Sequence, residues 1–170
     1  MFSRTTALFA PLIALGLATP ALAESTGEIA LTIAGEDLVL PLRGGQSDWS
    51  GSANWPSVSL SARAFNADGE DPVVLSLSFD AANWTPSVPE LRLTRYEDSQ
   101  VVEKLFSGED QEDGALTVTL GSHDLNGTTL SLTGSFQGTM GTSDNYGRDI
   151  DLSQGKPVEG TFEVTVEQLE

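Results

Sequence analysis

Cysteine is absent from this chain of 170 residues. The fold therefore cannot depend on disulfides, and no thiolate is available as a nucleophile or as the acceptor of a lipoprotein anchor. Histidine occurs once, as His123, so a zinc site built from nitrogen and sulfur ligands has too few donors. Packing and hydrogen bonds are left as the forces that hold the fold.

Basic residues are also scarce. Eight Lys and Arg stand against 25 Asp and Glu, which gives a formal net charge of −17. A surface of this sign repels nucleic acid and anionic membranes, so we expect neither as a partner. The charge is compatible with simple solubility, with calcium or with a basic partner.

The one long apolar run lies at the N-terminus and is too short for a comfortable membrane span. Arg4 precedes the apolar run Ala7–Ala18, and Ala21-Leu22-Ala23 fits a signal peptidase site. We expect residues 1–23 to be a signal peptide cleaved before Glu24, with a short membrane anchor as the alternative. The mature protein is then periplasmic or secreted and not integral to a membrane, and a Gram-negative envelope is the expected location.

The mature sequence shows no convincing helix, and apolar and polar residues alternate along most of it instead. The clearest runs lie in the last third of the chain: Leu116, Val118, Leu120; Leu130, Leu132, Phe136; and Phe162, Val164, Val166. A period of two is typical of antiparallel strands with one buried face. About eight to ten short strands predict an all-β fold, an antiparallel β-sandwich with a β-barrel as the alternative, formed by residues 24–170 as a single domain.

Two of these runs share a local pattern, Gly134-Ser135-Phe136 and Gly160-Thr161-Phe162. A strand glycine beside a large aromatic residue indicates a bulge or a close backbone approach next to a packed ring. With Leu116–Leu120, these stretches resemble uncharacterised bacterial envelope β-sandwich proteins that end in paired Gly-x-Phe strands. The resemblance implies a sandwich without a known activity and carries over no site residues. Many of those proteins are lipoproteins, whereas this chain lacks the cysteine that would carry the lipid.

Three segments interrupt the alternation and are predicted to be loops: Arg43–Pro56, Asp80–Pro89 and Gly141–Pro157, the last with a short strand at Ile150–Leu152. The segment Gln100–Phe106 fits either helical or strand spacing, and its short length favours a strand.

All three tryptophans, Trp49, Trp55 and Trp84, fall in the first two of these loops. Aromatic side chains on loops stack on sugar rings or anchor a protein partner. They also plug the open ends of sandwiches, and this packing role is the favoured interpretation. If the three side chains bind a partner, we expect an envelope protein or a glycan.

Acidic loops raise the question of calcium, which prefers six to eight oxygen ligands. Three loops offer side-chain oxygen atoms: Asp68, Glu70, Asp71; Glu109, Asp110, Glu112, Asp113; and Asp144, Asn145, Asp149, Asp151. The third is the best candidate, with Asp144, Asp149 and Asp151 as ligands, although it does not fit the EF-hand template. Acidic residues that only solvate turns are the favoured alternative, so no cofactor is expected unless calcium binds.

His123 followed by Asp124 invites a general-base interpretation, in which the chain is a small hydrolase. A polar hairpin turn explains the same residues more simply. We therefore expect an exported, non-enzymatic binding domain, with a calcium-dependent structural module as the alternative and a hydrolase as the least favoured hypothesis.

Overall fold

The computed structural model describes residues 24–65, 69–111 and 113–169, and the predicted signal peptide lies outside this range. The described residues form ten strands, and their one helical element is the short 3-10 helix Gly44–Gln46. The strands are β1 (Thr26–Ile33), β2 (Glu36–Pro41), β3 (Asp48–Ser52), β4 (Trp55–Phe65), β5 (Pro72–Ala82), β6 (Thr85–Glu97), β7 (Gln100–Gly108), β8 (Thr117–Asn126), β9 (Thr129–Thr142) and β10 (Asp151–Gln168). The all-β prediction is confirmed, and β7 confirms the strand predicted at Gln100–Phe106.

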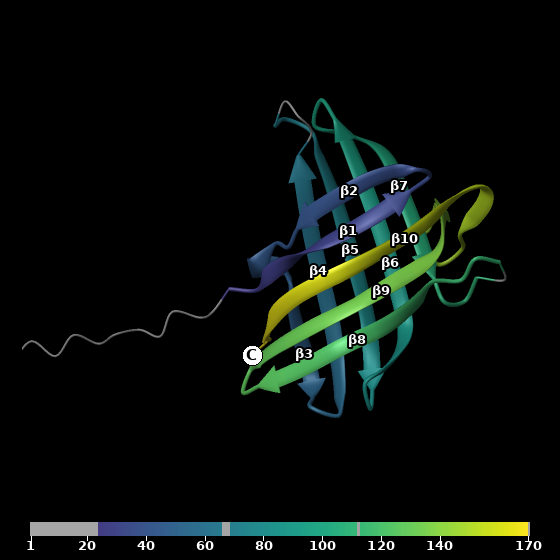
Figure 1. Cartoon of the computed structure of the whole chain (residues 1–170). Coiled ribbons are helices and arrows are strands. Elements are labelled where there is room, and N and C mark those ends of the chain that lie inside the picture. The colour runs from purple at the N-terminus through teal and green to yellow at the C-terminus, as the bar shows by residue number, and fades with distance from the viewer. Residues whose placement is uncertain (1–23, 66–68, 112, 170) are drawn as a thin grey trace, which may run out of the picture.

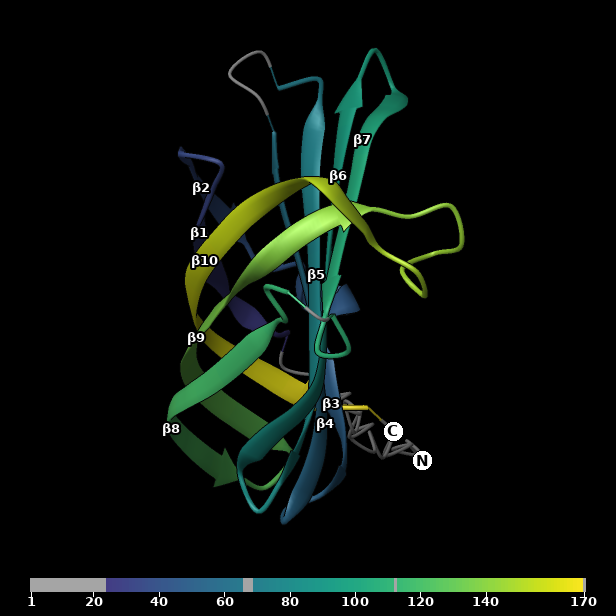
Figure 2. The same ribbon diagram turned by 90° about the vertical axis from the view of Figure 1, so that its right-hand side faces the viewer.

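All ten strands belong to one sheet that folds over into two layers (Figures 1 and 2). The front layer has the order β2-β1-β10-β9-β8, and the back layer has the order β3-β4-β5-β6-β7. The two layers cross at an angle and face each other, which is the predicted sandwich arrangement.

Short pairings join the layers along their edges. The C-terminal end of β10 runs parallel to β3 through Glu167 beside Asp48 and Gln168 beside Trp49. On the other side, Phe106 of β7 pairs with Gly141 of β9. The β7–β9 pair and the remaining strand pairs are antiparallel. The parallel pair makes the sheet mixed, a detail that the alternation pattern does not predict.

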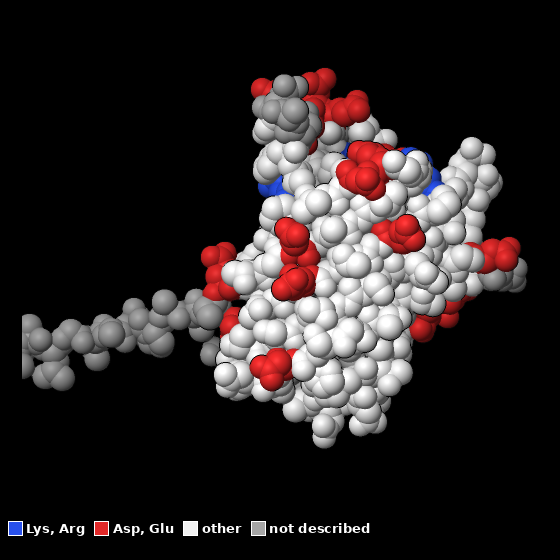
Figure 3. Space-filling model, in the orientation of Figure 1, with Lys and Arg blue, Asp and Glu red and all other residues white. Residues whose placement is uncertain are grey.

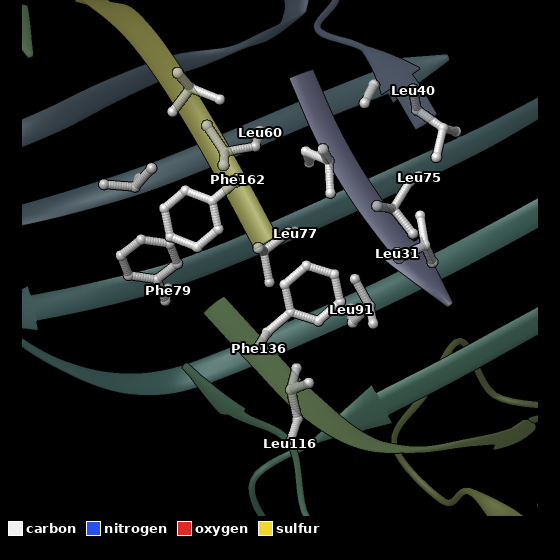
Figure 4. Close-up of a cluster of buried hydrophobic side chains, with 14 of the residues drawn as sticks. Leu31, Leu40, Leu60, Leu75, Leu77, Phe79, Leu91, Leu116, Phe136 and Phe162 are labelled. Atoms are coloured by element: carbon white, nitrogen blue, oxygen red, sulfur yellow. The ribbon is translucent and has the colours of Figure 1, made fainter. Parts of the chain in front are cut away.

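The core lies between the layers and consists of inward-facing aliphatic and aromatic side chains. Phe136 and Phe162 of the front layer extend toward Leu77, Phe79 and Leu91 of the back layer (Figure 4). All five are at most 2% exposed, so each side chain contributes about 1.5–3 kcal/mol through burial.

Two predicted loops are strands in the structure. The segment Arg43–Pro56 contains β3, and the segment Asp80–Pro89 contains the ends of β5 and β6, joined by the two-residue turn Asn83-Trp84. Both turn residues have positive φ, 49° and 62°, as in the type I′ turns that match strand twist. The prediction for Asp80–Pro89 was wrong because this turn forms without glycine. The prediction for Arg43–Pro56 was wrong because β3, Asp-Trp-Ser-Gly-Ser, lacks the β-branched residues that are typical of strands.

The predicted loop Gly141–Pro157 is shorter than expected. Strand β9 continues to Thr142 and β10 begins at Asp151, so the connection covers residues 143–150. In β10 the register shifts between Asp151 and Lys156, and this irregularity hides the start of the strand from a period-two pattern.

The outer face of the front layer carries separate groups of acidic side chains and little positive charge (Figure 3). In the part of the chain that the structure describes, no helix has the length and apolarity needed to cross a membrane.

Candidate functional site

A hollow with a volume of about 900 Å³ lies against the outer face of the back layer, over β5, β6 and β7. Its floor follows from the alternation in β5. Leu75 and Leu77 point into the core, so Ser76 and Ser78 point outward. The neighbouring strand places polar side chains beside them, since polar residues again alternate with buried leucines there.

The register of the strands aligns the floor residues in two rows. Ser76 lies opposite Arg92, and Arg92 lies opposite Phe106. In the next row Ser78 lies opposite Glu90. Residues that are directly opposite share a face of the sheet, so hydroxyl, guanidinium and carboxylate groups meet on one surface.

The 143–150 connection forms one wall of the hollow. It passes beyond the edge of β7 onto the outer side of the back layer (Figure 2), where it covers Phe106, which is only 7% exposed. Gly147 has a φ of 92°, and a Cβ atom there would lie 2.8 Å from the Phe106 ring. A glycine is therefore required for this close approach.

Tyr146 stands at the rim of this wall and is 84% exposed. The ammonium of Lys104 lies 5.0 Å from the centroid of the Tyr146 ring and 5.4 Å from that of Phe106. Cation–π attraction from one lysine to two rings restrains the exposed tyrosine. The hollow thus presents an aromatic face that is already ordered.

Hydrogen bonds within the 143–150 connection fix its shape. The Ser143 hydroxyl oxygen accepts from the Gly147 N–H at 2.8 Å. The Asn145 side-chain oxygen accepts from the Asp149 N–H at 2.9 Å, and its amide donates to the Asp149 carboxylate at 2.6 Å. This wall therefore needs little ordering when a ligand binds.

The opposite wall is built around Gln111. Its side-chain oxygen accepts from the Ser107 hydroxyl at 2.9 Å and from the Gly108 N–H at 2.6 Å, and its amide donates to the Thr139 carbonyl at 3.1 Å. The Gln111 side chain, which lies in the turn after β7, thus connects the end of β7 to β9.

A bulge in β6 forms the lip of the hollow next to this wall. Two residues of β6, Val88 and Pro89, oppose a single residue of β5, and Val88 has a φ of 50°, which is unusual for a branched residue. The Glu109 carboxylate accepts the Val88 N–H at 2.7 Å and holds this conformation.

The charges around the hollow are mixed. Arg92 and Arg148 supply positive charge, and both are exposed. The carboxylates in the lining are all exposed as well: Glu90, Glu109, Asp110, Asp113 and Asp149. The hollow is therefore a polar binding surface rather than a site that excludes water.

The three tryptophans do not share a surface. Trp49 lies in β3, is 2% exposed, and donates its indole N–H to the Thr128 carbonyl at 2.8 Å. Trp55 begins β4 and is 61% exposed. Trp84 packs against the core and stacks on His123, with ring centroids 3.9 Å apart. Placing Trp49 and Trp55 in a loop was wrong, because both belong to strands. Binding through the three tryptophans stays a prediction.

Two of the three proposed calcium ligands are engaged in other bonds, and the third, Asp144, is exposed. Asp149 bonds with Asn145, and Asp151 accepts from the Ser153 N–H at 2.8 Å. That bond and one from the Ser153 hydroxyl lower the pKa of Asp151. Among the described residues no three of His, Cys, Asp and Glu are grouped as metal ligands, while Asp68 and Glu112 of the other loops lie outside that range. Calcium binding stays a prediction.

His123 and Asp124 lie in β8, not in the expected turn. His123 pairs with Leu132 and points inward, whereas Asp124 pairs with Ser131 and points outward. The two side chains are therefore on opposite faces and do not form a general-base pair. The turn prediction was wrong because a bulge at Gly121 shifts the alternation by one residue.

Sequence reasoning missed the hollow itself. The outward serines of the Val73–Phe79 run were visible as the polar half of its alternation, but Arg92, Gln111 and Tyr146 come from separate elements. Nothing in the sequence shows that these residues meet.

Comparison of the chain with protein-family models, with curated proteins and with solved structures found no match in any of the three. The resemblance to bacterial envelope proteins therefore stays a prediction, and the function must be argued from the geometry.

Proposed function

We propose that this protein is an exported, non-enzymatic recognition domain that binds a glycan in the hollow over β5, β6 and β7. The observation that carries the proposal is the exposed ring of Tyr146, held by Lys104 above a floor of hydroxyl and charged groups. Sugar rings stack on such aromatic faces, and their hydroxyls hydrogen-bond to serine, carboxylate and guanidinium groups.

A glycan fits this surface better than a protein partner does. Protein interfaces are centred on buried aromatic or aliphatic anchors in a dry core, whereas this hollow combines apolar residues with hydroxyl, guanidinium and carboxylate groups, and its charged groups are exposed to water. Its walls are fixed by internal hydrogen bonds, which lowers the entropic cost of binding a flexible chain.

Binding without hydrolysis follows from the same surface. Glycoside cleavage by paired carboxyl groups requires one of them to be kept protonated, usually by burial. Each carboxylate of the hollow is exposed to water. We therefore expect a bound glycan to be released unchanged.

The test is binding of the exported chain to a panel of immobilised oligosaccharides. The panel contains neutral sugars and their uronate, phosphate and sulfate derivatives. Tyr146→Ala removes the ring and is expected to weaken binding by about ten-fold or more. Trp55→Ala is the matched control, because it removes another exposed aromatic side chain, at the start of β4 and outside the hollow.

Unchanged binding in Tyr146→Ala together with a loss in Trp55→Ala would move the site to the tryptophan predicted from the sequence. Absence of binding to every sugar of the panel would reject glycan recognition and leave a protein partner. Release of reducing sugar during incubation would reject the non-enzymatic part of the proposal.

A further inference from the structure

The described part of the chain contains few basic side chains, and most of them have a partner. Arg95 and Lys156 both form ion pairs with Glu103. Arg63 lies 4.1 Å from the centroid of the Phe65 ring, and Lys104 lies between two rings. None of these four is fully exposed, so their charges already stabilise the fold.

Arg92 and Arg148 are different. Among the described residues, they are the two basic side chains that are exposed, and both line the same hollow. They come from different elements, Arg92 from the middle of β6 and Arg148 from the 143–150 connection. Neither forms an ion pair with any described residue, although carboxylates line the same hollow and the net charge is −17.

We infer that the glycan bound in this hollow carries an anionic group that is held by Arg92 and Arg148. This inference rests on the proposed function and deepens it by assigning the class of sugar. The planar guanidinium matches carboxylate, phosphate and sulfate groups through paired N–H donors, and two such side chains can hold one anion from two directions. A neutral sugar would leave both guanidinium groups without an anionic partner.

The carboxylates around the hollow restrict the ligand further. Glu90 lies on the floor next to the row that holds Arg92, and Glu109 lies at the lip. These groups accept hydrogen bonds from sugar hydroxyls and repel any second anionic group that passes close to them. The ligand therefore carries isolated acidic groups between neutral sugar units, and a dense polyanion is excluded.

The test compares matched sugars in the same panel by calorimetry on the exported chain. Each neutral oligosaccharide is measured beside the derivative that carries one uronate, one phosphate or one sulfate. We expect at least one acidic derivative to bind about ten-fold more tightly than its neutral parent, and more weakly as salt increases. The three arms identify which anion is recognised.

Three variants locate the effect. Arg92→Gln and Arg148→Gln are each expected to bring the affinity for the acidic sugar close to that for its neutral parent, because each variant weakens binding of the acidic sugar more than binding of the neutral one. Arg43→Gln makes the same change in net charge but lies outside the hollow, and it is expected to keep the preference for the acidic sugar. Thermal melts of each variant confirm that the fold is retained.

The outcomes separate the two claims. If neutral and acidic sugars bind with equal affinity and Tyr146→Ala binds neither, the claim of an anionic group is overturned and the glycan site is retained. The inference is also overturned if both arginine variants still bind the acidic sugar more tightly than its neutral parent. Failure of every sugar to bind overturns the proposed function and the inference with it.

Discussion

At the scale of single residues, two glycines explain how the centre of the front layer is packed. Gly134 lies opposite Phe162, and Gly160 lies opposite Phe136, so each ring covers the glycine of the neighbouring strand. A Cβ at Gly134 would overlap the Phe162 ring and come within 2.7 Å of the Thr119 carbonyl oxygen. The Gly-x-Phe pattern in the sequence is therefore a reciprocal close approach, as one of the two interpretations predicted.

Alanine at either glycine is expected to destabilise the protein by about 2 kcal/mol or more, because rings in a close-packed core cannot move without strain. Gly134→Ala and Gly160→Ala should each lower the midpoint of urea unfolding, followed by tryptophan fluorescence. Gly45→Ala is the control, since a Cβ at Gly45 meets no atom within 4 Å. Equal midpoints for all three variants would contradict the packing described for the two rings.

At the scale of elements, the sequence predicted strands wherever one face is buried and the alternation is unbroken. It failed at bulges, as at Gly121 and Val88, because one extra residue reverses the face of every side chain that follows. It also failed at the Asn83-Trp84 turn, where φ is positive without glycine. Tertiary packing fixes these features, and local propensity does not reveal them.

The candidate site was less predictable than the fold for the same reason. Its floor residues occupy the polar positions of ordinary strands, and Tyr146 belongs to a connection that the sequence could only describe as irregular. The position of Tyr146 depends on Lys104 and Phe106 of β7, about forty residues earlier in the chain. Contacts between such distant segments leave no local signal.

Strand β3 provides a prediction at this scale. Its Trp49 is buried and bonds to the turn between β8 and β9, so Trp49→Phe is expected to lower the free energy of unfolding by about 1–3 kcal/mol. Trp55→Phe, at an exposed position, should stay within about 0.5 kcal/mol of the parent. Chemical denaturation of the two variants measures both values. A larger loss for Trp55→Phe would mean that β3 does not bury Trp49.

At the scale of the whole molecule, the two ends of the sandwich are closed in different ways. At one end Arg95 of β6 pairs with Glu36 of the front layer at 2.8 Å and with Glu103 at 3.2 Å, and Glu103 also pairs with Lys156 of β10. At the other end the Trp84 ring of the back layer stacks on His123 of the front layer. Charged and aromatic contacts thus join the layers where the aliphatic core ends.

Removal of Arg95 is expected to weaken the contact between the layers. Arg95→Gln leaves Glu36 without an ion pair at this position and should cost about 1–2 kcal/mol, a modest value because the network is partly exposed. Arg92→Gln on the same strand makes the same chemical change at a residue without an ion pair, and it should leave stability nearly unchanged. Thermal melts at low and high salt compare the two, and equal melting temperatures would contradict a linking role for Arg95.

The proposed function places a glycan in the hollow over β5, β6 and β7. The most direct measurement is an amide NMR titration of the isotopically labelled chain with the acidic oligosaccharide that binds best in the panel. The largest shift changes are expected at Ser76, Ser78, Arg92 and Tyr146, and they should saturate with one affinity. Changes confined to Trp55, Trp84 and the outer face of the front layer would contradict the proposed function.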